Sequence, residues 1–174
     1  MTNATPADAV GARIEQRTTN MAQRTTTGSP TDGQRSFQDL HFPDGTCFGC
    51  GPANANGLRL KSFPGPDGPM VAEFTPTPAH QAAEGVVCGG IVGTVLDCHA
   101  AAVASAELGI DFAAGEGLVT KTYTVDLLRA TPVEALTLVA RAVDVRTRSV
   151  TIDAELRHGD EVCATFRGLF VAPT

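Results

Sequence analysis

Between Gly85 and Ala106 the chain carries a single formal charge, Asp97, within an apolar, alanine-rich run that contains Cys88-Gly89-Gly90. A helix that is apolar on all sides is buried in the core of its protein. A carboxylate buried without a partner is costly, so such a group is paired, exposed at one edge or used for chemistry. The run therefore predicts a central buried helix that carries a functional acid and has a glycine-rich N-terminus two turns upstream.

Composition limits the classes of protein to which the chain can belong. Its 174 residues are enough for one domain and a tail. A formal net charge of −6 argues against a nucleic-acid-binding protein, which needs a basic face to neutralise phosphates. Gly, Ala, Thr or Asp interrupts every apolar run that approaches the length of a membrane span, so we expect no membrane association. The first residues lack a basic patch followed by an apolar core, so we also expect no secretory signal.

The five cysteines are Cys47, Cys50, Cys88, Cys98 and Cys163. An odd number of cysteines, some of them inside apolar runs, fits a reducing compartment, and we expect the protein to be cytoplasmic. Cys47 and Cys50 form a Cys-x-x-Cys pair, which is weak evidence for zinc because a structural site needs four ligands. No second pair has a suitable spacing, so we expect no metal.

The chain divides into a tail and one domain. Residues 1–35 contain too few apolar side chains for a core face and are predicted to be disordered, and the domain occupies residues 36–174. Alternating apolar residues and turn signals predict strands over 58–61, 70–74, 118–128, 136–145, 150–156 and 162–171. The apolar run predicts a helix over 86–108 that ends at Gly109.

The predicted order is two strands, the helix and a four-stranded meander, which is an α+β fold with one helix packed on an antiparallel sheet. Within the strand after the helix, Val119, Tyr123, Val125 and Leu127 are expected on one face, with Thr120 on the other. A single sheet covers one side of a helix, so we expect the remaining apolar face of the helix to meet a second subunit.

A series of short motifs runs from about Cys47 to Val171. They are Cys47-Phe48-Gly49-Cys50-Gly51, Asn56-Gly57-Leu58, His80-Gln81, Gly85 to Gly90 with Asp97, Thr120, and Val125 to Arg129 with Pro132. Together they resemble the hotdog-fold acyl-CoA thioesterases of the PaaI-like group, and the Gly-Gly-to-Asp spacing inside an apolar helix is the specific part.

The resemblance implies a hotdog fold, in which a curved antiparallel sheet wraps a long central helix, assembled as homodimers or as dimers of dimers. It also implies hydrolysis of an acyl-CoA or related thioester to a free acid and a thiol, at a site on the dimer interface. No metal or redox cofactor is implied. The candidate residues on the substrate side are Cys88, Gly90, Gln81, Ala82 and Arg129.

Three residues are candidates for the chemistry. Asp97 is the candidate general base or nucleophile, unless it leans into solvent or pairs with an arginine such as Arg129. A backbone N–H at a helix N-terminus has no intrahelical partner and can stabilise an oxyanion, and the resemblance assigns this role to Gly89. Thr120 matches the position in the family whose hydroxyl positions the attacking water or supports the carboxylate.

The spacing of Gly89 and Asp97 constrains the assembly. Eight residues correspond to about 12 Å along a helix, which is too far for both groups to act on one carbonyl. If both serve one reaction, they come from two helices. A two-fold dimer with antiparallel helices would supply Gly89 from one chain and Asp97 from the other.

Cys88 departs from the family, in which His usually precedes the two glycines and helps to shape the site of the substrate carbonyl. The departure raises the alternative of a hotdog protein that binds an acyl-CoA or aromatic ligand without turnover. Cys88 could also be a nucleophile, because a helix N-terminus lowers the pKa of a thiol. His80 and His99 are only nearby in the sequence, so we favour a small buried residue. A third alternative, hydration of an enoyl thioester, usually needs an Asp/His pair that this sequence lacks.

Overall fold

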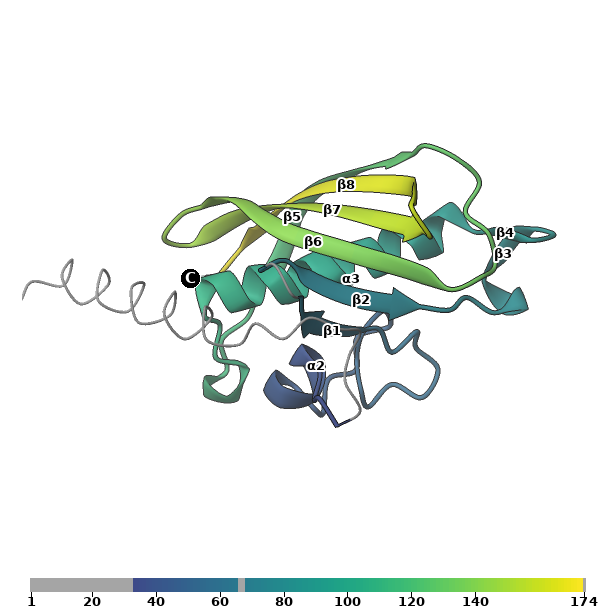
Figure 1. Cartoon of the computed structure of the whole chain (residues 1–174). Coiled ribbons are helices and arrows are strands. Elements are labelled where there is room, and N and C mark those ends of the chain that lie inside the picture. Colours follow the sequence, from purple (N-terminus) through teal and green to yellow (C-terminus); the bar gives the residue numbers. More distant parts are fainter. Residues whose placement is uncertain (1–32, 66–67, 174) are drawn as a thin grey trace, which may run out of the picture.

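The computed structural model describes residues 33–65 and 68–173, so the predicted tail lies outside the described residues over positions 1–32. One curved antiparallel sheet wraps the long helix α3 (Gly89–Leu108), with the short helix α2 (Phe37–His41) beside the sheet edge (Figure 1). The strand order is β1-β2-β6-β7-β8-β5. The strands are β1 (Lys61–Pro64), β2 (Met70–Phe74), β5 (Val119–Leu127), β6 (Leu136–Val145), β7 (Ser149–His158) and β8 (Glu161–Val171). The predicted α+β hotdog architecture is therefore confirmed.

Helix α3 begins three residues later than predicted. Val86–Val87 forms strand β4, which pairs with β3 (Gln81–Ala83), and Cys88 takes the N-cap position. The helix ends as predicted at Gly109, which adopts a left-handed conformation with φ 63°. By length and composition α3 could cross a membrane, but 61% of its apolar window is buried inside the protein, so its place in the core accounts for its apolarity.

The prediction of a four-stranded meander is wrong. Strands β6, β7 and β8 are consecutive neighbours, but β5 pairs with β8 and forms the edge of the sheet. The segment between β5 and β6 is too long for a hairpin turn. It instead runs past the start of α3, where Val87 N–H donates to Thr131 O and Val133 N–H donates to Gly85 O. These two hydrogen bonds hold the segment between β5 and β6 in place as it crosses from the edge of the sheet to the inner strand β6.

The first strand is also displaced from its predicted position. Leu58–Lys61 was expected to be extended, but Arg59 adopts φ 53°, and strand β1 begins only at Lys61. A left-handed residue interrupts the extended backbone, and alternation of residue types does not reveal it.

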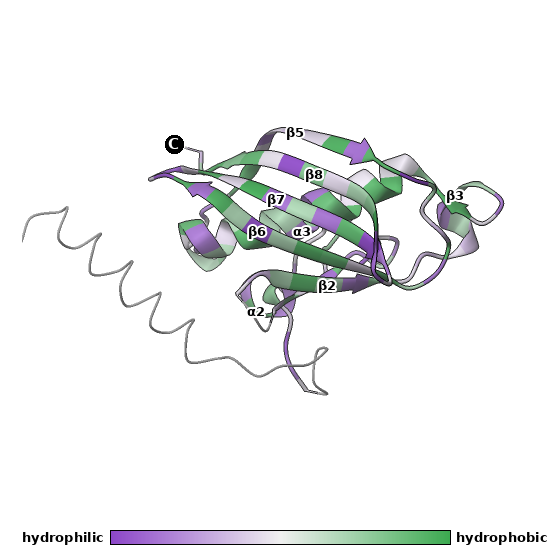
Figure 2. Ribbon diagram, turned by 45° about the horizontal axis from the view of Figure 1, so that its top comes forward, coloured by the Kyte–Doolittle hydropathy of each residue, from purple (hydrophilic) through white to green (hydrophobic). Residues whose placement is uncertain are grey.

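The faces of the sheet follow the expected alternation. Residues of β7 alternate between buried and partly buried, and Figure 2 shows hydrophilic and hydrophobic bands along the strands of the sheet. The chain covers α3 incompletely: 11 of its 20 residues are buried, while Gly90 is exposed and Thr94, Asp97 and Ala101 are only partly buried along one side of the helix. Four of the eight large exposed apolar side chains among the described residues gather on the edge strand β5 and just after it. They are Val119, Tyr123, Leu127 and Leu128, each about half exposed, and the other four are Leu40, Phe48, Val143 and Val145.

A chain of buried hydrogen bonds joins α2, β1, β2 and α3. Gln38 Nε2 donates to Ser62 Oγ (3.1 Å), and Ser62 Oγ lies 2.9 Å from His99 Nδ1. His99 Nε2 lies 3.1 Å from the carbonyl oxygen of Met70, which can only accept. His99 therefore carries its proton on Nε2 and accepts at Nδ1, and the complete chain requires a neutral imidazole.

Burial lowers the pKa of His99 from 6.5 to about 4. Since the unfolded chain binds this proton more readily than the native protein, the contribution to stability is complete above pH 6.5 and is lost as the pH falls toward 4. We predict that the free energy of unfolding decreases by about 3 kcal/mol through this window. Chemical denaturation at a series of pH values measures the slope, which should largely disappear in His99→Gln. An equal slope in wild type and variant would contradict the assignment.

Candidate active site

The single charge of the apolar run between Gly85 and Ala106 has a specific partner. Asp97 lies partly buried on α3, and Thr120 on β5 donates a hydrogen bond from Oγ1 to Asp97 Oδ1 (2.9 Å). Arg129 instead forms an exposed ion pair with Glu161 (2.7 Å). The alternative in which Asp97 pairs with Arg129 is therefore wrong.

A β-bulge places Thr120 on the face that contacts α3. The register between β5 and β8 shifts between Thr120 and Thr122, so the simple alternation expected for this strand does not hold. Beyond the bulge, Tyr123 stacks on the buried Phe166 with ring centroids 5.3 Å apart. Without the extra residue, Thr120 and Tyr123 would point to opposite faces, as the sequence had suggested. The bulge allows both to face inward.

Burial is the largest influence on Asp97 and raises its pKa, while the hydrogen bond from Thr120 lowers it and the nearby Cys47 raises it further. A carboxylate with a raised pKa is a stronger base than an ordinary aspartate. The Thr120 hydroxyl fixes the orientation of one carboxylate oxygen and leaves the second oxygen for another partner. The arrangement suits a group that accepts a proton or attacks an electrophile.

The N-terminus of α3 forms the second half of the predicted site. Cys88 is the N-cap, and its side chain makes no capping hydrogen bond with the described residues. Gly89 is the first helical residue, so its N–H has no intrahelical acceptor. A Cβ at Gly89 would lie 2.9 Å from Leu127 Cδ1, which shows how closely β5 approaches the helix here.

Gly89 and Asp97 lie on one continuous helix, as predicted. Eight residues of α-helix separate them by about 12 Å, so one chain does not bring the two groups to one reacting atom. Tyr123 and Leu127 face α3 from β5 and are still 48% and 55% exposed. The side of α3 that carries Gly89 and Asp97 is therefore open rather than sealed by its own chain.

The histidines near Cys88 in the sequence have other contacts. Both ring nitrogens of His99 belong to the buried chain of hydrogen bonds, so His99 is packed and does not serve Cys88 as a base. His80 stacks on Phe74, and its Nδ1 accepts a hydrogen bond from the backbone N–H of Thr77 (3.0 Å). These contacts favour the interpretation of Cys88 as a small residue in the place of the family histidine, although Cys88 is only partly buried and not fully buried as expected.

The remaining predicted substrate residues lie around the start of α3. Gln81 and Ala82 are in β3, where the Gln81 side chain spans its loop, donating to Pro78 O and accepting from Gly85 N–H. Gln81 therefore shapes the loop in front of the helix, while Ala82 is exposed. Gly90 is exposed at the second helical position.

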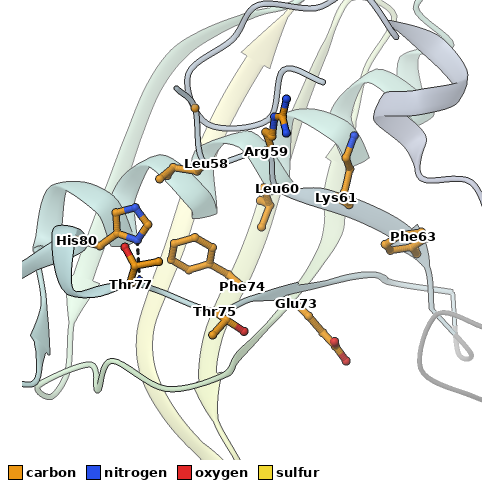
Figure 3. A pocket seen from close by; sticks show the side chains of 11 residues that line it. Leu58, Arg59, Leu60, Lys61, Phe63, Glu73, Phe74, Thr75, Thr77 and His80 are labelled. Atoms are coloured by element: carbon orange, nitrogen blue, oxygen red, sulfur yellow. Dashed lines mark hydrogen bonds between the residues drawn. The ribbon is translucent and has the colours of Figure 1, made fainter. Parts of the chain in front are cut away.

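A surface pocket of about 460 Å³ lies beside this region (Figure 3). Its lining includes Arg59, Lys61, Phe74 and His80. None of the described residues that line it belongs to the predicted catalytic or substrate-binding set. The pocket therefore does not contain the Asp97–Thr120 pair.

The structure brings a third cysteine to the Cys-x-x-Cys pair. Cys98, which follows Asp97 on α3, places its Sγ 3.7 Å from Cys47 Sγ, and the sulfur atoms of Cys47, Cys50 and Cys98 all lie within 4.8 Å of one another. The hydrogen bond from Cys98, together with the backbone N–H groups of Cys50 and Gly49, lowers the pKa of Cys47 to about 5. The same hydrogen bond raises the pKa of Cys98. The sequence could not reveal this cluster, because Cys98 lies 51 residues after Cys47.

Comparison with known proteins places this geometry in context. Residues 84–165 match the family described as the thioesterase superfamily. This segment contains the start of α3, Asp97 and Thr120. No curated protein matches the sequence.

Solved structures share the fold. A thioesterase superfamily protein from Shewanella loihica PV-4 is 30% identical, with a TM-score of 0.56 over 70% of this chain and 97% of that one. A phenylacetic acid degradation-related protein from Ralstonia eutropha JMP134 is 20% identical, with a TM-score of 0.59 over 79% and 99% of the two chains. The E. coli PaaI protein from the phenylacetic acid degradation operon is 21% identical, with a TM-score of 0.57 over 70% and 85%.

Proposed function

The chain belongs to the thioesterase superfamily, and from that membership we propose that it hydrolyses an acyl-CoA-type thioester to a free acid and a thiol. The family supports thioester hydrolysis in general, and the acyl-CoA substrate is the finer part of the proposal. One observation carries it for this chain: the only formal charge between Gly85 and Ala106, the apolar run that forms most of α3, is a carboxylate that Thr120 orients and that burial makes more basic.

In the proposed reaction, Asp97 either accepts a proton from water or attacks the carbonyl carbon directly. In the first case the water oxygen bonds to the carbonyl carbon, and the carbonyl oxygen takes the negative charge. The Gly89 N–H donates a hydrogen bond to that oxyanion at the positive end of the helix dipole. The C–S bond then breaks, and the leaving thiolate takes the proton from Asp97. No metal or redox cofactor takes part in the proposed chemistry.

We further propose that the site is shared by two chains of a homodimer, which can pair further as a homotetramer. Gly89 and Asp97 are too far apart within one helix, whereas an antiparallel helix from a second copy would bring one group of each chain together. The edge strand β5 supports this assembly, since it carries Val119, Tyr123 and Leu127 about half exposed. Edge strands with exposed apolar residues are prone to pair with another chain.

The role of Asp97 is tested by Asp97→Asn, which keeps the shape of the side chain and removes its charge. We predict that kcat falls by about 10²–10⁴-fold, because both proposed roles require a carboxylate. Thiol release from short, long and aromatic acyl-CoAs measures this and defines the acyl preference. Asp126→Asn on β5 is the matched control, since Asp126 is exposed, and it should retain wild-type turnover.

A wild-type protein that binds acyl-CoA stoichiometrically without releasing thiol would overturn hydrolysis and support the binding-protein alternative. Cys88 at the N-cap is the observation that favours this second function, because the family usually has His there. In that case Cys88→His should introduce thiol release.

The Gly89 donor is tested by Gly89→Pro, which removes the N–H at a position where proline suits a helix. Cys88 has φ −60° and ψ 131°, a conformation that a following proline accepts. We predict a decrease in kcat of about 10²–10³-fold with the fold intact. Gly89→Ala is the control, because it adds the same Cβ beside the exposed Leu127 but keeps the N–H. Equal losses in both variants would assign the effect to the Cβ and exclude the hydrogen bond.

Mixing the two inactive variants tests the shared site. A dimer of one Asp97→Asn chain and one Gly89→Pro chain contains one site with both groups intact and one site with neither. Statistical reassembly should therefore recover about a quarter of wild-type turnover if the groups come from different chains. If each chain used its own Gly89 and Asp97, every site would lack one group and no activity would return.

A further inference from the structure

The sulfur atoms of Cys47, Cys50 and Cys98 are arranged like the ligands of a single metal ion. Each pair of sulfur atoms lies within 4.8 Å, and Cys47 and Cys98 are separated by 3.7 Å. Sulfur atoms bound tetrahedrally to zinc at about 2.3 Å lie about 3.8 Å from one another. We propose that these three cysteines bind a zinc ion, which fastens the loop Cys47–Gly51 to helix α3.

The loop is built to present its sulfur atoms to the helix. Gly51 N–H donates to Cys47 O (2.9 Å), and Leu58 N–H donates to Phe48 O (2.7 Å). These hydrogen bonds hold the backbone of the loop around Cys47. The loop thus places Cys47 beside α3 before any ion arrives.

Glycine lets the loop reach the third ligand. A Cβ at Gly49 would overlap Cys98 Sγ and would lie 3.0 Å from Thr94 Cγ2, so only the bare backbone allows this approach to α3. Gly49 O in turn accepts a hydrogen bond from Leu60 N–H (2.9 Å), which anchors the loop to the start of the sheet. The close contact between the loop and α3 therefore depends on the absence of a side chain at Gly49 and on the hydrogen bond that anchors the loop to Leu60.

The ligand set selects the metal. Thiolates favour zinc over the hard cations calcium and magnesium, which prefer oxygen. The described residues supply three sulfur ligands, two of them on buried cysteines, while Cys47 is exposed. Because Cys47 is exposed, the fourth position of a tetrahedral zinc ion is open to a ligand from outside the described residues. The zinc ion takes no part in the proposed thioester chemistry itself, and its role is to fasten the loop to the helix.

Metal analysis of the full-length protein, purified under reducing conditions without chelator, tests the proposal. We expect about one zinc per chain in the wild type and in the control Cys163→Ala, whose cysteine is in β8 outside the cluster. Cys47→Ser, Cys50→Ser and Cys98→Ser should each lose zinc. Copper or iron in place of zinc, or full zinc in Cys47→Ser, would overturn the assignment.

Two further measurements keep the test decisive if a serine variant fails to fold. Cobalt added to chelator-treated wild type should produce a thiolate-to-cobalt charge-transfer band and the visible bands of tetrahedral cobalt. Chelator should lower the Tm of the wild type but leave that of Cys47→Ser unchanged. A wild type that gives no such spectrum, or in which Cys47 and Cys98 form a disulfide under reducing conditions, would exclude the zinc site.

Discussion

The fold depends on the burial of one apolar helix. Helix α3 has too little polar surface to face water, so the chain must cover it, and the sheet does so by curving around it. The position of the edge strand β5 follows from that requirement. It crosses to pair with β8, and Thr120 on this strand then meets Asp97, the partly buried carboxylate of the helix. The need to bury α3 therefore determines both the curvature of the sheet and the position of Thr120 beside Asp97.

Much of this architecture was predictable because burial imposes a period on the sequence. Strands β2 and β6 have the predicted bounds, since their buried and exposed residues alternate. Asp97 could be recognised as a candidate functional residue because burying a charged side chain in an apolar helix is costly unless the charge is paired or used for chemistry. The N-terminus of α3 was less certain, because Val86 and Val87 are as apolar as the helix itself and pairing with β3 decides their conformation.

The features that escaped prediction depend on contacts between distant residues or on single backbone angles. The bulge after Thr120 depends on pairing with β8 and reverses the face on which that hydroxyl lies. The left-handed Arg59 delays β1 although its neighbours alternate correctly. The contact of Cys98 with Cys47 exists only once the N-terminal loop is folded against α3. No local pattern encodes any of these three.

Helix α3 carries three kinds of chemical group along its length. Its first turn offers free backbone N–H groups, Asp97 lies two turns further, and Cys98 follows on the next position. Consecutive residues of a helix point about 100° apart, so Asp97 can face Thr120 while Cys98 faces the loop that contains Cys47. At one position along its axis, the helix therefore presents a reactive face, which carries Asp97, and an anchoring face, which carries Cys98. Fastening the anchoring face leaves the carboxylate little freedom to move away from the hydroxyl that orients it.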